Sequence, residues 1–541
     1  MKRTPVALAV VLTAAVAVSG CAPSANSAAP SPDSESSMTV VLPDTNITLS
    51  LDNGFGGLEV LTQLNATLIR KPYEESSIAG NLQQNVNEYE PYLADSWEMS
   101  DDGLTYTFHL GDAVSAAGNE ISSDDVLWSW ERRFNTPTSA VPSMQKPQIT
   151  SLDQFTKIDD KTFSITVEQP GYGATLLALL ADLTSWIYDS TYLQEHATPD
   201  DPYAVKWSAE NANYGFGPYE LTSYESGSGA TLEAREDFVL GEPDIDEVVM
   251  RIVPDAGNRA NLVRTGDADF AMQVLPADLV DLEAGEGTKT GRVDDPNAYL
   301  MMPLVTNKPP FDDALVRQAM AYAVPYDQII ENVYHGMAVR NGPGFVRTDH
   351  PGYSDDGLED FTFDPEKARE LLTEAGHPDG VSFELTVDAA QPAMQATAIQ
   401  IQTFAKEAGF DVQINQVPAS GYGAGRSDHS FQSFLLQDWA ITLTPSYELN
   451  IYTAPGGTNN LADWANDEFL AAKAAGDALP DPYTDEAGEA WNAAERILVN
   501  EAPILFIAQV QPNVAMSDDV QGFAWRSDNR IDFSSMSIDA D

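Results

Sequence analysis

Strand-like and helix-like segments alternate along almost the whole chain, and this alternation restricts the possible fold more than any other feature. Leu104 to Leu110 (LTYTFHL) and Lys161 to Val167 (KTFSITV) alternate apolar with polar residues, which is typical of half-buried strands. Ala396 to Ala408 is predicted as a helix that Gly409 ends. Because helices and strands are interleaved in this way, we expect an α/β or mixed α+β protein.

Residues at the ends of other segments predict further boundaries. Ser122 or Ser123 is expected to cap a helix, because two acidic residues follow in its first turn, where the helix dipole favours them. Gly57 to Arg70 carries leucines at helical spacing and is predicted as a helix. Ile47 to Leu51 is predicted as a short strand.

Length and charge limit the class of protein. A chain of 541 residues, 43% of them hydrophobic, is long enough to divide into at least two lobes with separate cores. The 28 basic and 83 acidic residues give a net charge of −55, which argues against nucleic acid as a partner. We interpret the acidic excess as a surface feature that favours solubility; the alternative is a field that concentrates a cationic ligand.

The amino-terminal segment has the features of an export signal. Lys2 and Arg3 precede an apolar run that is too short to span a bilayer comfortably, and residues 1–20 are therefore predicted to be a signal peptide. The following VAVSGC resembles a bacterial lipobox, which implies cleavage before Cys21 and its diacylation. The alternative is a stray cysteine behind an ordinary signal peptide. Residues 21–37, rich in Ala, Ser and Pro, are predicted to be a flexible tether.

Common catalytic motifs are missing from the sequence. There is no GxSxG, no GxxxxGK[ST] and no HExxH, and none of the six histidines forms a close pair at metal-ligand spacing. The single cysteine, at the lipobox, has no partner for a disulfide within the chain. We therefore expect a binding protein without catalytic residues, without a metal site and without a cofactor.

Five segments, in chain order, are Pro91 to Arg133, Gly215 to Phe270, Leu304 to Ile330, Phe363 to Gly376 and Ala494 to Gln509. They include GFGPYEL, LVTNKPPFDDALVRQAMAYAVPYDQII and FDPEKARELLTEAG. The five segments together resemble the family 5 solute-binding proteins of ABC importers, whose members bind oligopeptides, dipeptides or nickel. Together these segments span nearly the whole chain after the tether.

The resemblance implies a type II, cluster C periplasmic-binding-protein-like fold with two lobes. The first lobe would combine residues 38–73, 207–296 and 507–541, and an extra domain, residues 74–206, would be inserted in it. The second lobe would be residues 297–506. Two strands would cross between the lobes, near residues 297–301 and 504–510, and closure on a ligand would be a hinge motion about them.

The resemblance also implies a function. The chain would capture a small solute, most often a short peptide, and deliver it to the permease subunits of an ABC transporter. It would be a monomer, held by its lipid at the outer face of the cell membrane, on the periplasmic side if an outer membrane is present. A saccharide, an opine or a metal chelate remains an alternative ligand, and a stand-alone sensor lipoprotein remains an alternative role.

Candidate ligand contacts lie in Gln437 to Tyr452 (QDWAITLTPSYELNIY), because the resemblance places much of the recognition there. We single out Asp438, Trp439 and Tyr447, since an aromatic plane stacks on a ligand and a carboxylate accepts an amine. Ordinary packing is the alternative for both aromatic residues. Oligopeptide-binding members carry an acid for the peptide's amino group near the position of Thr442, where this chain has none; either Asp438 takes its place or the ligand is not a peptide.

Further candidates have weaker support. Tyr422 and Arg426 belong to SGYGAGR, which is predicted to be a glycine-rich loop that folds over a ligand, with Arg426 available for a carboxylate. A surface loop without contact to a ligand is the alternative. The remaining candidates lie where loops are expected to reach the space between the lobes: Asn53, Phe55, Tyr73 and Trp464.

Overall fold

The computed structural model describes residues 36–43, 48–53, 57–136, 149–340, 342–457, 459–481 and 483–539. The described residues belong to one compact unit, Ser36–Asp541. The predicted signal peptide, Cys21 with most of the predicted tether, and Phe55 lie outside the described residues.

A seven-stranded sheet has the strand order β10-β11-β12-β1-β13-β22-β14. Its strands are β1 (Ser37–Leu42), β10 (Tyr219–Glu225), β11 (Gly229–Ala234), β12 (Glu247–Ile252), β13 (Phe270–Ala271), β14 (Thr288–Gly291) and β22 (Val514–Ser517). β1 pairs in parallel with β12 and β13, and the other pairs are antiparallel. The carboxyl-terminal β22 therefore completes a sheet that begins with the first described strand.

Both faces of this sheet are buried around β1. Val40 of β1 packs in one apolar cluster with Val60 and Leu64 of α1 (Glu59–Leu64). Val41, on the opposite face, packs in a second cluster with residues of α7 (Ala256–Thr265) and α8 (Pro276–Glu283). This alternation follows from the two-residue period of a strand.

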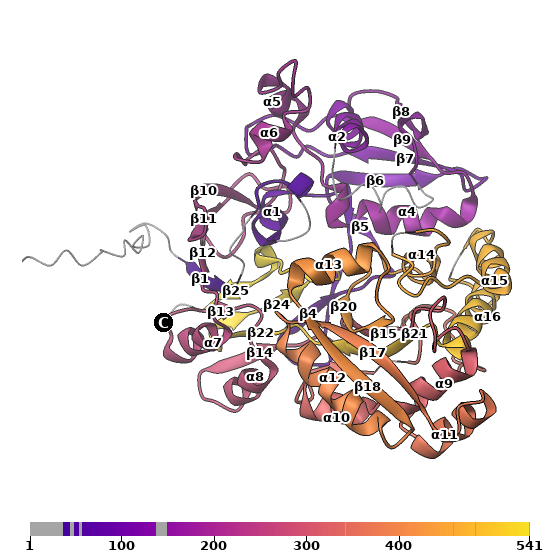
Figure 1. Ribbon diagram of the computed structural model, residues 1–541. Helices are drawn as coiled ribbons and strands as arrows, with labels where there is room; N and C mark the ends of the chain where they lie inside the picture. Colours follow the sequence, from indigo (N-terminus) through magenta and orange to yellow (C-terminus); the bar gives the residue numbers. More distant parts are fainter. Residues whose placement is uncertain are drawn as a thin grey trace, which may run out of the picture. The chain divides into compact units, whose positions relative to one another are not determined.

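A four-stranded sheet and a three-stranded sheet follow. The first has the order β16-β21-β15-β20 and the second β18-β17-β19. The strands are β15 (Tyr299–Pro303), β16 (Ala338–Val339), β17 (Val381–Asp388), β18 (Phe410–Val417), β19 (Ser433–Phe434), β20 (Leu436–Asp438) and β21 (Ile504–Val510). The helices are α9 (Ala314–Ala323), α10 (Tyr326–Asn332), α11 (Pro365–Glu374), α12 (Pro392–Ala405), α13 (Ala419–Ser427), α14 (Pro445–Ile451), α15 (Asp467–Asp477) and α16 (Asp485–Glu501). In Figure 1, α12 lies beside β17 and β18, which it contacts.

Another four-stranded sheet, β6-β7-β9-β8, is formed by the part of the chain between α1 and β10. Its strands are β6 (Ala94–Met99), β7 (Thr105–Leu110), β8 (Phe155–Lys157) and β9 (Thr162–Thr166), with α2 (Ser123–Asn135), α4 (Gly173–Leu180), α5 (Ser190–Glu195) and α6 (Val205–Ser208) around them. The rings of Phe108 and Phe163 stack across neighbouring strands, and Trp130 of α2 packs on Phe155. The sheet thus has its own aromatic core.

Short elements complete the described chain. They are η1 (Leu51–Asn53), η2 (Leu152–Gln154), η3 (Pro170–Tyr172), η4 (Leu183–Ser185), η5 (Phe533–Ser535), β2 (Ile69–Arg70), β3 (Tyr73–Glu75), β4 (Asn81–Gln84), β5 (Glu90–Pro91), β23 (Val520–Gln521), β24 (Phe523–Trp525) and β25 (Ser537–Ile538). β24 pairs with β4, β2 with β5 and β23 with β25.

The chain passes twice between the seven-stranded sheet and the sheet that contains β15 and β21. β14 belongs to the former and the next strand, β15, to the latter; β21 belongs to the latter and the next strand, β22, to the former. β15 and β21 are antiparallel neighbours. Two adjacent connections therefore join these sheets, while the exact lobe and domain boundaries stay a prediction.

Three local predictions have clear outcomes. Ser122 caps α2 in a capping box with Asp125, as predicted. The helix predicted over residues 57–70 is too long, because α1 ends at Leu64 and residues 69–70 form β2. The strand predicted over residues 47–51 is wrong in its described part, where a bend precedes η1.

The described residues contain no helix that is both long and apolar enough to cross a bilayer.

A buried carboxyl group on α16 predicts a pH dependence of stability. Burial raises the pKa of Glu495 to about 7, although its carboxylate accepts the Val346 N–H at 2.8 Å. Between the unfolded value of 4.5 and about 7 the folded protein binds more protons, so this group's contribution falls as pH rises. We expect the free energy of unfolding of the parent, relative to that of Glu495→Gln, to fall by about 2–3 kcal/mol from pH 5 to pH 8. Urea denaturation measures it, and a difference independent of pH would contradict the assignment.

Candidate functional site

One cavity of the described structure has a volume of about 820 Å³. One side is lined by the segments 254–276 and 510–530, which belong to the predicted first lobe. The other side is lined by the segments 388–394 and 422–439, which belong to the predicted second lobe. Ala298 and Val510, beside the two connections between the sheets, also line it. A volume of this order suits a small solute.

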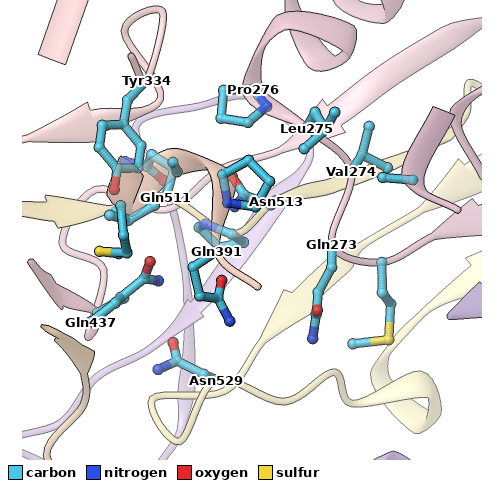
Figure 2. Close-up of a pocket in the computed structure, with 18 of the residues that line it drawn as sticks. Gln273, Val274, Leu275, Pro276, Tyr334, Gln391, Gln437, Gln511, Asn513 and Asn529 are labelled. Atoms are coloured by element: carbon cyan, nitrogen blue, oxygen red, sulfur yellow. The ribbon is translucent and has the colours of Figure 1, made fainter. Parts of the chain in front are cut away.

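Side-chain amides make up much of the polar lining, as Figure 2 shows. They come from separate parts of the chain: Gln273, Gln391, Gln437, Gln511, Asn513 and Asn529. Each carboxamide has an oxygen acceptor and two N–H donors. The cavity can therefore form many hydrogen bonds without introducing charge.

Two ion pairs line the cavity. A guanidinium nitrogen of Arg426, on α13, lies 3.7 Å from a carboxylate oxygen of Asp438 at the end of β20. A guanidinium nitrogen of Arg530 lies 3.8 Å from Glu59 Oε1. The same guanidinium is 5.9 Å from the centre of the Trp439 ring. The Trp439 ring thus lies near one ion pair, and Trp439 directly follows Asp438 of the other in the chain.

Asp438 is held in place by its neighbours. Its Oδ1 accepts the Trp439 N–H at 3.0 Å. Burial raises the pKa of Asp438, and the positive charge of Arg426 opposes this shift. The ionised form of Asp438 is therefore most stable when the Arg426 guanidinium remains close to it.

Arg259 of α7 fixes the loops at the edge of the cavity. Its guanidinium donates to the carbonyl oxygens of Met272 at 2.8 Å and Gln273 at 2.6 Å, and also to those of Val253 and Pro254. Gln273 has a φ of 50°, in the left-handed region that non-glycine residues rarely adopt. The buried arginine offsets the cost of this conformation and holds the Gln273 backbone at the cavity.

Asn297 connects the two walls of the cavity next to the loop that follows Trp439. Its buried side chain donates to the Ala440 carbonyl at 2.6 Å and the Ser527 carbonyl at 2.7 Å, and it accepts the Ala440 N–H at 3.0 Å. Its own carbonyl accepts from the Asn529 amide. One side chain therefore fixes the loop after Trp439 against the loop that carries Asn529 and Arg530.

Four of the predicted site residues line this cavity together: Asp438, Trp439, Tyr422 and Arg426. Tyr422 is largely buried and donates its hydroxyl to the Leu435 carbonyl. The prediction that SGYGAGR is a loop is wrong, because this segment is part of α13. Its glycines disfavour a helix, but a side chain at Gly425 would collide with Phe431, so close packing on the aromatic cluster requires glycine there.

The other predicted site residues lie elsewhere. Thr442, Tyr447 and Trp464 are buried and do not line the cavity. Trp464 donates its indole N–H to Glu501 at 2.8 Å and packs on Phe469.

The three candidates from the amino-terminal part are not in the described lining of the cavity either. The Tyr73 hydroxyl donates to Asp532 at 3.2 Å, and Tyr73 is not among the lining residues. Asn53 ends η1, and Phe55 lies outside the described residues. Contact with a ligand stays a prediction for all ten candidates.

The sequence did not point to several lining residues. Glu59, Arg530 and the amides other than Gln437 belong to segments in which no motif singles them out. The only available signal was position, because Gln511 and Asn513 directly follow the fully buried strand β21. Of these two residues, Gln511 is buried and its carboxamide exchanges two hydrogen bonds with the Val293 backbone.

No group of three or more His, Cys, Asp or Glu side chains within the described ranges is arranged to hold a metal ion.

Comparison with known proteins gives consistent results. The family model described as bacterial extracellular solute-binding proteins, family 5 Middle, matches residues 88–460. Heme-binding protein A of Haemophilus influenzae is 28% identical over 479 residues, which cover 84% of each chain. The dipeptide-binding protein of Escherichia coli is 27% identical, with 84% of this chain and 87% of the relative covered.

Solved structures share the fold. The periplasmic binding protein DppA from Helicobacter pylori, in complex with the peptide STSA, superposes with a TM-score of 0.77 at 23% identity, covering 93% of this chain and 98% of that one. NikA from Brucella suis, in complex with Fe(III)-EDTA, superposes with a TM-score of 0.78 at 19% identity, covering 93% and 99%. The predicted mixed α/β, periplasmic-binding-protein-like fold is thereby confirmed.

Proposed function

Because the chain belongs to family 5 of the bacterial extracellular solute-binding proteins, which bind solutes for ABC import and are not enzymes, we propose that it carries a short peptide. The peptide occupies the cavity of about 820 Å³ and is delivered to the permease subunits of an ABC importer. The cavity is the observation that carries this proposal, since its walls come from both predicted lobes. A ligand there contacts both walls at once and favours the closed arrangement over an open one.

The two connections between the sheets support a hinge. They are adjacent, because β15 and β21 pair directly, and the cavity lies next to both. Rotation about neighbouring backbone segments changes the width of a cleft without breaking either lobe's core. We include the predicted lobe boundaries, with the extra domain at residues 74–206, in this proposal.

We further propose that the protein is a lipoprotein that acts as a monomer at the outer face of the cell membrane. The lipobox-like VAVSGC supports Cys21 as the lipidated residue, and the tether that follows is rich in Ala, Ser and Pro. Two acyl chains hold a protein at a bilayer stably, whereas one chain holds it weakly. A flexible tether lets the anchored protein reorient towards a permease.

One experiment tests both parts of the proposal. The protein is purified from membranes of its own host and studied by native mass spectrometry, then by denaturing mass spectrometry. We expect a chain that begins at Cys21 and carries the mass of a diacylglyceryl group, with a peptide that is released on denaturation. A Cys21→Ser variant is the control, and it should be recovered from the medium without the lipid mass.

The lipid mass and the released peptide test the two parts of the proposal separately. A native chain that keeps residues 1–20 and carries no lipid would refute the anchor alone. If no solute is released, and no peptide raises the melting temperature of the purified protein, the proposed peptide transport is wrong.

A further inference from the structure

The cavity lining differs in charge from the rest of the chain. Acidic residues outnumber basic residues 83 to 28 in the whole sequence. In the lining, three acids (Glu59, Asp388 and Asp438) face three arginines (Arg259, Arg426 and Arg530), so the formal charges cancel. The acidic surface field therefore does not extend into the cavity as a net charge that would attract a cation.

The charged groups of the lining are already engaged with one another or with the backbone. Arg426 lies 3.7 Å from Asp438, and Arg530 lies 3.8 Å from Glu59. The Arg259 guanidinium donates to four carbonyl oxygens, as described above. A charged ligand end would have to be desolvated and would also compete with these existing partners, which costs binding free energy.

Asp388, the remaining acid, is engaged as well. Its Oδ1 accepts the N–H of Ala390 at 2.9 Å, in the turn that precedes α12. Each carboxylate of the described lining therefore already has a partner in the protein, which a ligand ammonium group would have to share or displace.

Neutral hydrogen-bonding groups, in contrast, are available. The side chains of Gln273, Gln391 and Gln437 are exposed at the cavity and make no hydrogen bond to another described residue. Carboxamides pair well with the N–H and C=O groups of amides.

We propose that this site binds peptides whose ends carry no charge, such as N-blocked and C-blocked or cyclic peptides, and discriminates against free zwitterionic peptides. This inference rests on the proposed function and specifies its ligand. The carboxamides of Gln273, Gln391 and Gln437 bind peptide amide groups, and the two ion pairs stay intact in the complex.

A peptide library in two matched forms tests the inference. The mature full-length protein is mixed at pH 7 with a tripeptide library, either with free ends or N-acetylated and C-amidated, and complexes are quantified by native mass spectrometry. We expect the blocked forms to bind at least tenfold more tightly than their free counterparts. Free forms that bind as tightly as the blocked forms would overturn the inference and leave peptide transport standing. If neither form binds, the proposed function fails together with the inference.

A variant that removes the positive charge beside Asp438 gives a second, independent measurement. Arg426→Gln removes the partner of Asp438, so we expect the ratio of free to blocked binding to rise at least threefold above that of the parent. Arg251→Gln, at an exposed arginine of β12 outside the cavity, is the matched control and should leave this ratio unchanged. An unchanged ratio in a folded Arg426→Gln variant would also overturn the inference.

Discussion

Replacing Trp439 by alanine is expected to weaken ligand binding about 30-fold to 100-fold. The ring lines the cavity next to Asp438, and the Arg530 guanidinium lies 5.9 Å from its centre. Aromatic side chains in the centre of a binding site typically contribute 2 kcal/mol or more, which corresponds to about a 30-fold change in affinity. Isothermal titration calorimetry with the ligand identified by mass spectrometry measures the effect.

Two controls separate recognition from packing, because Trp439 also packs against the cluster that contains Leu61 and Trp186. Trp439→Phe keeps an aromatic plane and should stay within about fivefold of the parent affinity. Trp491→Ala removes a buried tryptophan that is not a candidate contact and lies outside the cavity, so it should lower the melting temperature and leave the affinity of the folded protein unchanged. Parent-like binding by Trp439→Ala would remove Trp439 from the site.

Local elements were predicted where the sequence carries the physical cause within a few residues. Ser122 and Asp125 form the capping box of α2 because both partners lie within one turn. The fold followed from five collinear segments that resemble a family, and not from periodicity alone. The helix predicted over residues 57–70 failed, because the chain becomes extended at Asn65, so its leucines are buried partly in α1 and partly beyond it.

The helix α13 shows how tertiary packing overrides local preference. Three glycines between Ala419 and Ser427 favour a loop. In the structure the Tyr422 hydroxyl donates to Leu435, and Phe431 packs where a side chain at Gly425 would be. Both partners follow the helix after a turn at residues 428–429, and no motif specifies the direction in which that turn returns the chain, so the packing could not be predicted.

The candidate site was predictable only on one side. Asp438, Trp439 and Gln437 are consecutive, so a resemblance that singles out one of them locates all three. Gln273 and Gln391 lie more than one hundred residues apart and carry no motif. Only the folded arrangement brings their carboxamides to the same cavity, and only it shows that the arginines of the lining are already engaged.

Asn297→Ala is expected to lower the free energy of unfolding by about 3–5 kcal/mol and to weaken ligand binding about tenfold. Alanine leaves the Ala440 N–H and the carbonyls of Ala440 and Ser527 buried without the partner they have in the parent. Each unsatisfied buried group costs about 1–3 kcal/mol. Affinity falls as well, because Ala440 follows Trp439 directly and its loop loses its fixed position. Urea denaturation and calorimetry measure the two effects.

Two further variants distinguish a specific role of the Asn297 amide from a general loss of packing. Asn297→Asp keeps an oxygen for the Ala440 N–H but places a carboxylate against two carbonyl oxygens, so it should be at least as damaging as alanine despite its matching size. Asn332→Ala, at the exposed end of α10, should change neither stability nor affinity measurably. If Asn297→Asp behaved like the parent, Asn297 would not connect the two walls of the cavity through its amide, and the fixed geometry of the Trp439 loop would need another cause.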